Sequence, residues 1–193
     1  MARSKQFKQE VVLQKAIELF TQKGYHGTSM DNLVKTLGIN RASMYNTFGS
    51  KKELYRKALR TYGEERAAGI AEFLYYQLNV RQGIYKLFES LLSEFQIPNN
   101  KSGCLLVNSI AELANEDKEI KNLTLELEDG ITSSIQSYLK YGVENGQVSH
   151  YKNVGEISSY FFLLYSGVMV GAINAENNDK LLMLVNNSIS ILD

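Results

Sequence analysis

The sequence contains no tryptophan, a single proline, Pro98, and a single cysteine, Cys104, among its 193 residues. One cysteine excludes an intramolecular disulfide framework and argues against a cysteine-based zinc site. Because proline interrupts helix interiors more strongly than any other residue, its scarcity permits a chain that is mostly helical. Hydrophobic residues make up 44% of the sequence, which is enough for a sizeable core and argues against global disorder.

Motifs of common catalytic and metal sites are also missing. The two histidines, His26 and His150, are not accompanied by a Ser-His-Asp arrangement, an HExxH motif or a glycine-rich phosphate loop. We therefore expect no enzymatic activity, no cofactor and no metal site.

A targeting segment is not visible, because the N-terminal residues MARSKQFKQE carry no apolar stretch after their basic residues. The one stretch near the length of a membrane span is residues 157–175, which are 19 residues without a charge. Its serine, glycine and asparagine residues dilute its hydrophobicity, which favours a buried helix in a soluble, cytoplasmic protein without membrane contact. A membrane-associated helical protein is the alternative.

The formal net charge of +0 hides an uneven distribution of charge along the chain. Residues 1–66 contain 13 Lys and Arg against 6 Asp and Glu, whereas residues 67–193 contain 8 against 15. The basic first third indicates that the N-terminal part contacts a polyanion such as nucleic acid. The acidic remainder of the chain is not expected to make such a contact. Two solvated surfaces of opposite sign are the alternative reading.

Apolar periodicity predicts helices in the first third of the chain. A stripe with i, i+3, i+4, i+7 spacing precedes Gly24, which is a typical helix-ending residue. A second stripe runs from Met30 to Leu37, with Thr28 or Ser29 as its N-cap. The residues of the first stripe are Leu13, Ala16, Ile17 and Phe20.

A short turn and a third helix follow directly. Gly38, Ile39 and Asn40 separate the second helix from a short one, for which Asn40 is a good N-cap. Ser50 and Glu53 then form the capping box of a fourth helix. Two short helices joined by a glycine-containing turn of this length form a helix-turn-helix.

The second helix of this motif presents one polar side. Met44 and Phe48 are expected to pack inward, while the remaining polar residues point outward as donors that read base edges or bind phosphates. These outward residues are Arg41, Ser43, Asn46 and Thr47. An ordinary helical hairpin with a polar face is the alternative, but the turn residue and the basic surroundings favour DNA binding.

Longer helical patterns fill the rest of the chain, and no apolar alternation predicts a strand. The expected helices are residues 81–96, 104–115, 118–146, 154–175 and 179–192. Pro98-Asn99-Asn100 marks a break between the first two.

Two stretches of the first third resemble motifs of a known family. Residues 24–34, GYHGTSMDNLV, resemble the pattern G-[YF]-x-x-[TS]-[TS]-[VM]-x-x-[IL]. Residues 37–54, LGINRASMYNTFGSKKEL, resemble A-G-[VI]-[SN]-[KR]-[GA]-[ST]-[LIM]-Y-x-[YH]-F-x-[SN]-K-[ED]-x-L. Together these patterns are typical of the TetR/AcrR family of bacterial transcriptional regulators, and the similarity covers roughly residues 7–62.

The resemblance implies an all-α fold. It places a helix-turn-helix DNA-binding domain at residues 1–50, a connecting helix at 51–66 and a C-terminal regulatory and dimerisation domain at 67–193. It also implies a homodimer on a palindromic operator in double-stranded DNA, usually a repressor that an unidentified small-molecule effector releases. The DNA contacts that it assigns are Thr28 or Ser29, Arg41, Ala42, Ser43, Tyr45, Asn46 and Lys51.

A second resemblance concerns the single cysteine. Residues 102–108, SGCLLVN, and residues 111–113, AEL, are similar to a segment of one family branch, some members of which respond to electrophiles or oxidants. A thiol-based sensor repressor acting through Cys104 is therefore an alternative function. A reactive thiolate needs access and nearby positive charge, and Lys101 is the only cation close in sequence. The simpler interpretation is a small buried side chain at a helix start.

The sequence suggests a ligand pocket and a dimer interface in the second part of the chain. Aromatic residues at helical spacing are candidates to line a cavity, although such residues often belong to a core. Candidate ligand-binding residues are Phe88, Phe95, Cys104, Tyr138, Tyr141, Tyr160 and Tyr165. Small residues four apart let two helices approach closely, and a second apolar helix follows at 181–192. Candidate interface residues are Gly167, Gly171, Ala175, Leu182 and Val185. A helical ligand-binding or architectural protein without regulation is the remaining alternative.

Overall fold

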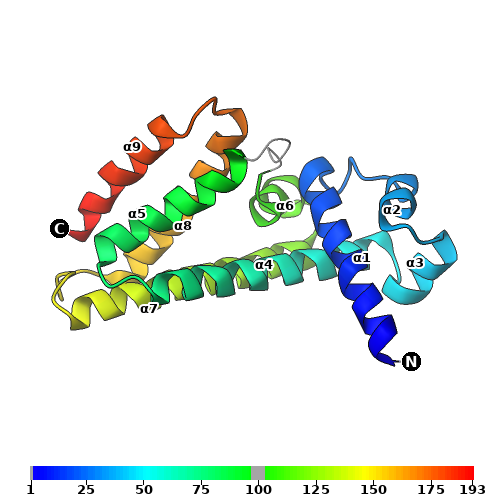
Figure 1. Cartoon of the computed structure of the whole chain (residues 1–193), viewed down its shortest axis with the longest axis horizontal. Coiled ribbons are helices and arrows are strands. Elements are labelled where there is room, and N and C mark those ends of the chain that lie inside the picture. Colours follow the sequence, from blue (N-terminus) through cyan, green and yellow to red (C-terminus); the bar gives the residue numbers. More distant parts are fainter. Residues whose placement is uncertain (1, 97–102) are drawn as a thin grey trace. The chain divides into compact units, whose positions relative to one another are not determined.

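The computed structural model describes residues 2–96 and 103–193, so the predicted break at residues 98–100 lies outside the described residues. Within them the chain forms nine α-helices, two short 3-10 helices and no strand, which confirms the all-α prediction (Figure 1). The helices are α1 (Ala2–Lys23), α2 (Met30–Leu37), α3 (Arg41–Phe48), α4 (Lys51–Tyr75), α5 (Val80–Ser93), η1 (Glu94–Gln96), α6 (Leu105–Leu113), α7 (Lys118–Glu144), α8 (Val154–Asn174), α9 (Asp179–Ser188) and η2 (Ile189–Leu192).

The chain divides into two units. The first unit comprises residues 1–62 and 104–125, and the second comprises residues 63–103 and 126–193. The first unit therefore joins the helix-turn-helix to α6 and the first turns of α7, which are far away in sequence. The domain boundaries expected at residues 50 and 66 remain predictions.

Side-chain caps define the short helices of the first unit. Ser29 is the N-cap of α2, where its Oγ accepts the Asn32 N–H at 3.1 Å. Asn40 caps α3 by accepting the Ser43 N–H at 2.8 Å. Gly38 between them has a φ of 67°, a left-handed conformation that costs glycine little because it has no Cβ. These caps confirm the predicted helix-turn-helix boundaries.

The expected capping box opens α4. The Glu53 carboxylate accepts the Ser50 N–H at 2.7 Å, and the Ser50 hydroxyl accepts the Glu53 N–H at 3.1 Å. The helix continues to Tyr75, beyond the expected end near residue 66, because no glycine cap or proline interrupts its periodic pattern.

A buried tyrosine lies at the centre of the first unit. The Tyr55 ring meets those of Phe20 and Tyr25 edge to face, at centroid distances of 4.8 and 5.0 Å. Its hydroxyl lies 2.6 Å from the Ser109 hydroxyl of α6, and burial raises the pKa of Tyr55 to about 12. The phenol therefore stays neutral and links α4 to α6 through a buried hydrogen bond.

The second unit packs α5, α8 and α9 against one another. Its core includes Ile84, Phe88, Phe161 and Val185, all nearly inaccessible to solvent. Within α7, a Cβ at Gly142 would lie 2.8 Å from Val80 Cγ2. Glycine therefore allows a close approach at this position, and α7 stays continuous despite it.

Helix α8 is long and apolar enough to cross a membrane by length and composition alone. One such helix is weak evidence for a membrane span, and 44% of its most apolar window is buried within the protein. Its apolar character is thus accounted for in part by packing within the second unit.

Candidate nucleic-acid interface

Helix α3 has the inward and outward sides that its sequence predicts. Met44 and Phe48 are buried, and Arg41, Ser43 and Asn46 are exposed, whereas Thr47, which was also expected to point outward, is half-buried. Ala42 is also exposed, and Tyr45 keeps 49% of its surface accessible. An eight-residue helix with an accessible polar side has the size and chemistry to read a DNA major groove.

The guanidinium of Arg41 lies between α2 and α3. Its Nη2 donates to Asp31 Oδ1 at 2.7 Å, and this contact raises the pKa of Arg41. Both side chains are exposed, and exposed ion pairs contribute little to stability. A base edge or a phosphate oxygen can therefore replace Asp31 as the acceptor at small cost.

The two alternatives at the start of α2 have different environments. Thr28 is fully buried, and its hydroxyl donates to the Gly24 carbonyl at 2.7 Å. Ser29 is exposed at the positive end of the α2 dipole. Of the two residues, Ser29 is thus the one accessible to a backbone phosphate.

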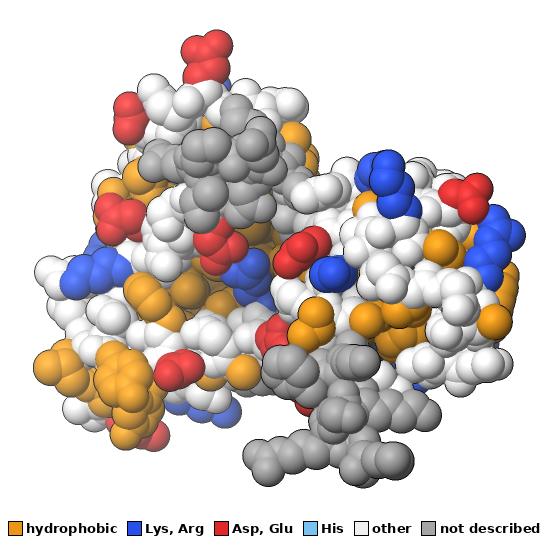
Figure 2. All heavy atoms as spheres, turned by 45° about the vertical axis from the view of Figure 1, so that its right-hand side comes forward, with side chains coloured by type: hydrophobic (Ala, Val, Ile, Leu, Met, Phe, Trp, Pro, Cys, Tyr) orange, Lys and Arg blue, Asp and Glu red, His pale blue; other side chains and the backbone are white. Residues whose placement is uncertain are grey.

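Lys51 lies at the start of α4. Its Nζ sits 4.2 Å from the centroid of the Tyr25 ring, and partial burial lowers the pKa of Lys51. The aromatic ring holds the ammonium against the turn that precedes α2. Figure 2 shows further Lys and Arg side chains on the surface of the first unit.

Glu112 of α6 binds the backbone of the same turn. Its carboxylate accepts the Tyr25 N–H at 2.9 Å and the His26 N–H at 2.8 Å. A Cβ at Gly24, where φ is 69°, would lie 2.7 Å from Glu112 Oε2, so glycine leaves room for the carboxylate. The sequence contained Glu112 within a recognisable segment, but only the fold reveals that this segment meets residues 24–26.

The candidate ligand-binding residues do not form one site. Tyr138 and Tyr141 stack at a centroid distance of 6.2 Å and line a pocket of about 890 Å³ in the second unit. Phe88, Phe95 and Tyr165 are buried in the core, and Tyr160 lies at the surface. Cys104, which is also buried, belongs to the first unit.

The 890 Å³ pocket is lined by the end of α4, the segment that follows it and α7. Its other lining residues are Ala71, Leu74, Tyr75, Tyr76, Gln77, Leu78, Ser133, Ser134 and Ser137. Tyr75 and Leu78 are among the most exposed hydrophobic residues, and Figure 2 shows such side chains gathered at lower left. The lining contains aromatic, aliphatic and hydroxyl groups and no charged residue.

The candidate interface residues also differ in environment. Gly167 is exposed, and a Cβ there would meet no atom within 4 Å. A Cβ at Gly171 would lie 3.0 Å from Leu181 Cδ2, and Val185 is fully buried within the second unit. Ala175 and Leu182 are half-buried.

The exposed apolar surface of α8 and α9 includes residues that the sequence analysis did not single out. Leu163 and Val170 are 68% and 52% exposed on α8, and Met183 and Leu184 are 54% and 44% exposed on α9. Apolar residues surround most of α8 in the sequence, so only burial in the structure distinguishes its outward side from its core side.

Comparison with known proteins identifies relatives of the whole chain. The family model "Bacterial regulatory proteins, tetR family" matches residues 12–58. The uncharacterized HTH-type transcriptional regulator YezE of Bacillus subtilis is 30% identical over 203 aligned residues that span 100% of both chains. The HTH-type transcriptional repressor ComR of Escherichia coli is 23% identical over 98% of this chain and 90% of its own.

A solved structure has the same fold with DNA bound. It is a cysteine mutant of the TetR family transcriptional regulator CifR complexed with 26-bp double-strand operator DNA. The TM-score is 0.82 at 23% identity, over 93% of this chain and 94% of the other.

Proposed function

The chain belongs to the TetR family of bacterial transcriptional regulators, and from this premise we propose that it is a homodimeric repressor released from a palindromic operator by a small-molecule effector. The observation that carries the DNA-binding role is the capped α2–α3 motif with the exposed polar side of α3. The name of the relative ComR supports a repressor rather than an activator. As a regulator that binds DNA, the protein acts in the cytoplasm and needs no enzymatic activity.

The proposed dimer uses the exposed side of α8 and α9. A palindrome needs two recognition helices held at a fixed separation, so a second copy of the chain is required. Leu163, Val170 and Met183 expose apolar surface that association would remove from water. Gly167 lies between the first two on α8 and allows a close approach of a partner helix.

The proposed effector binds in the 890 Å³ pocket beside Tyr138 and Tyr141. This volume falls within the range of small-molecule sites, and the uncharged lining suits an uncharged, partly aromatic ligand. The hydroxyl of Ser137 donates to the Ser133 carbonyl at 2.9 Å, so its oxygen remains able to accept a hydrogen bond from such a ligand.

Selection of genomic DNA fragments by the full-length protein tests the proposed function. We expect enrichment of a palindromic sequence, and we expect a reporter gene placed behind it to be repressed by the protein. Enrichment of fragments without a shared sequence would instead indicate an architectural protein.

Lys51→Ala and Arg41→Ala are expected to weaken operator binding in different ways. We propose that Lys51 binds a phosphate, so its loss should weaken binding to all sequences alike and lower the slope of log K against log salt by about one unit. We propose that Arg41 contacts a base edge, so its loss should also relax base preference, by about 1–3 kcal/mol at the position that it reads. Binding isotherms on a panel of altered operators, at several salt concentrations, measure both effects. Indistinguishable profiles for the two variants would contradict this division.

Cys104 is expected to react slowly with thiol reagents in the folded protein. Cys104 is the N-cap of α6, and only 1% of its surface is accessible to solvent. A thiolate reacts only when the reagent can reach its sulfur atom, so this burial should slow the reaction. Labelling with a chromogenic disulfide should therefore be at least about a hundredfold slower than in denaturant, since a buried site reacts only through rare opening. Equally fast labelling in both states would favour the alternative thiol-based sensor.

A further inference from the structure

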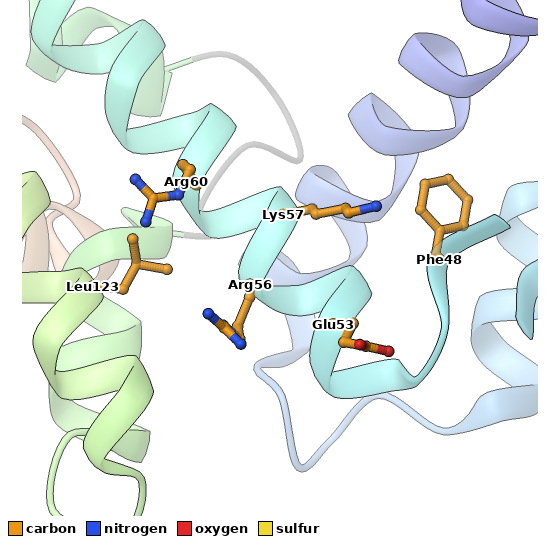
Figure 3. Close-up of a pocket in the computed structure, with 6 residues that line it drawn as sticks. All are labelled: Phe48, Glu53, Arg56, Lys57, Arg60 and Leu123. Carbon is orange, nitrogen blue, oxygen red and sulfur yellow. The ribbon is translucent and has the colours of Figure 1, made fainter.

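A second pocket lies in the first unit, beside the end of α3. Its volume is about 280 Å³, and it is bordered by α4, by the last residue of α3 and by the start of α7 (Figure 3). The lining residues are Phe48, Glu53, Arg56, Lys57, Arg60 and Leu123. The four residues from α4 follow the spacing i, i+3, i+4, i+7, so they share one side of that helix.

The charge of this pocket is mainly positive. Three of its lining side chains are cations and one is a carboxylate. Figure 3 shows Arg56 and Arg60 extending to the same side of α4, toward Leu123, while Lys57 extends toward Phe48. The carboxylate of Glu53 is already engaged, because it accepts the Ser50 N–H at 2.7 Å in the capping box. Arg56 and Lys57 alone therefore outnumber the single carboxylate that lines the pocket.

Arg56 has a donor without an acceptor. Its Nε is the one buried side-chain nitrogen or oxygen, among the residues that the structure describes, with no hydrogen-bond partner. Its Nη1 has a long contact of 3.3 Å with Glu119 Oε2, and Glu119 also binds Lys52 Nζ at 3.0 Å. A guanidinium has five donors in a planar fork, so Arg56 keeps most of its binding capacity. An unsatisfied buried donor costs free energy that a suitable acceptor would recover.

We propose that this pocket binds a small dianion, a phosphate monoester or a compact dicarboxylate, on the guanidinium of Arg56, with Lys57 adding positive charge from the opposite side of the pocket (Figure 3). Two anionic oxygens match the fork of Arg56, and a modest turn of its half-exposed guanidinium brings Nε–H toward them. A volume of about 280 Å³ lies just below the usual range of drug-sized sites, so it suits a compact metabolite. The buried Phe48 and Leu123 supply apolar walls that exclude water from one side of the ion pair.

The dianion would oppose DNA binding. Phe48 ends the helix that carries the candidate base contacts, and Lys57 Nζ lies 5.8 Å from its ring centroid. A ligand that draws Lys57 away changes the packing at this end of α3. It also cancels positive charge close to the site of a polyanion. This consequence rests on the proposed function, whereas binding of the dianion itself does not.

Calorimetric titration of the DNA-free, full-length protein tests the site directly. The probes are inorganic phosphate and succinate, each compared with chloride at matched ionic strength. Saturable binding is expected for the wild type, and Arg56→Met should weaken it at least about tenfold, the equivalent of one lost hydrogen bond to a charged group. Lys57→Met should act in the same direction. Lys121→Met removes an exposed charge from the same unit outside the pocket, and it should leave binding unchanged. Stronger binding of phosphate or of succinate identifies which of the two ligand chemistries the site prefers.

Several results would overturn the proposal. The first is that neither phosphate nor succinate binds saturably to the wild type. The second is that the wild type, Arg56→Met and Lys57→Met bind the probes with equal affinity while circular dichroism shows all three to be folded. A loss of operator affinity in Arg56→Met and Lys57→Met without any binding of the probes would identify these cations as DNA-backbone contacts instead. Where the probes bind, they should raise the operator Kd about fivefold or more in the wild type and leave Lys57→Met unaffected. Failure to enrich any operator would count against the proposed function but leave the calorimetric result standing.

Discussion

Replacing Gly167 by leucine is expected to convert the proposed dimer into monomers without unfolding the protomer. A Cβ at this exposed position of α8 meets no atom within 4 Å, so the protomer itself has room for the larger side chain. Leucine also has the higher helix propensity, which stabilises the helix by about 0.8 kcal/mol relative to glycine. In a close helix pair between two copies, however, the added side chain overpacks the interface, at about 1–3 kcal/mol for each site. The two-fold symmetry of a dimer places the substitution in the interface twice.

The effect on DNA should be larger than the effect on dimerisation alone suggests. Two linked heads bind a palindrome with an advantage of about 10²–10⁴ over one head, and a monomer loses this advantage. Analytical ultracentrifugation and operator titration measure the two quantities in the same preparation. Gly69→Leu is the matched control, because Gly69 is also an exposed helical glycine with open space around it, on α4. A Gly167→Leu protein that remains dimeric with native operator affinity would place the interface elsewhere.

Replacing Glu112 by alanine is expected to destabilise the DNA-binding unit and to weaken operator binding. The substitution removes both acceptors of the Tyr25 and His26 N–H groups, which join α6 to the turn before α2. Hydrogen bonds to charged groups contribute about 1.5–3 kcal/mol each, and partial exposure of this turn reduces the total to about 2–3 kcal/mol. Because Lys51 and Ser29 flank the same turn, disorder there displaces two candidate phosphate contacts.

Charge and hydrogen bonding can be separated by a graded series. Glu112→Gln keeps one acceptor oxygen, so it should fall between the wild type and the alanine variant in chemical denaturation. Glu116→Gln is the control for the loss of charge, because Glu116 makes an exposed contact of 3.3 Å with His26 and should cost less than about 0.5 kcal/mol. Gly24→Ala should also destabilise the unit, because its Cβ would lie 2.7 Å from the carboxylate and because alanine is strained at a φ of 69°. Equal stabilities of the Glu112 and Glu116 variants would show that the link to the turn has no energetic role.

Local patterns were sufficient to predict the helix-turn-helix. The caps at Ser29 and Asn40, the left-handed turn at Gly38 and the inward packing of Met44 depend on residues only a few positions apart. Interactions over such short distances along the chain depend little on the rest of the fold. The same reasoning predicted the all-α class. Proline is scarce along the whole chain, and the apolar residues keep a helical spacing in nearly every segment, so local patterns favour helices throughout.

Predictions that required distant contacts were less complete. Aromatic residues at helical spacing gave no means of separating Tyr138 and Tyr141, which line a pocket, from Phe88 and Tyr165, which belong to the core. Likewise, Gly167 and Val185 both suited a helix interface, yet one is exposed and the other is fully buried. Periodicity indicates that a helix has an apolar side but not which neighbour covers it.

The sequence by itself determined an all-helical chain with an N-terminal helix-turn-helix, because those properties depend on neighbouring residues, and its motifs carried the resemblance to the TetR family. Tertiary structure alone decided the partners of side chains that are far apart along the chain. It brought Glu112 to the backbone of Tyr25 across 87 positions, and it placed Arg56, Phe48 and Leu123 around one pocket. Such contacts depend on how whole helices pack against one another. The packing is determined by the sum of many small burial and hydrogen-bond energies. These contributions are spread over the whole chain, so no single sequence motif predicts them.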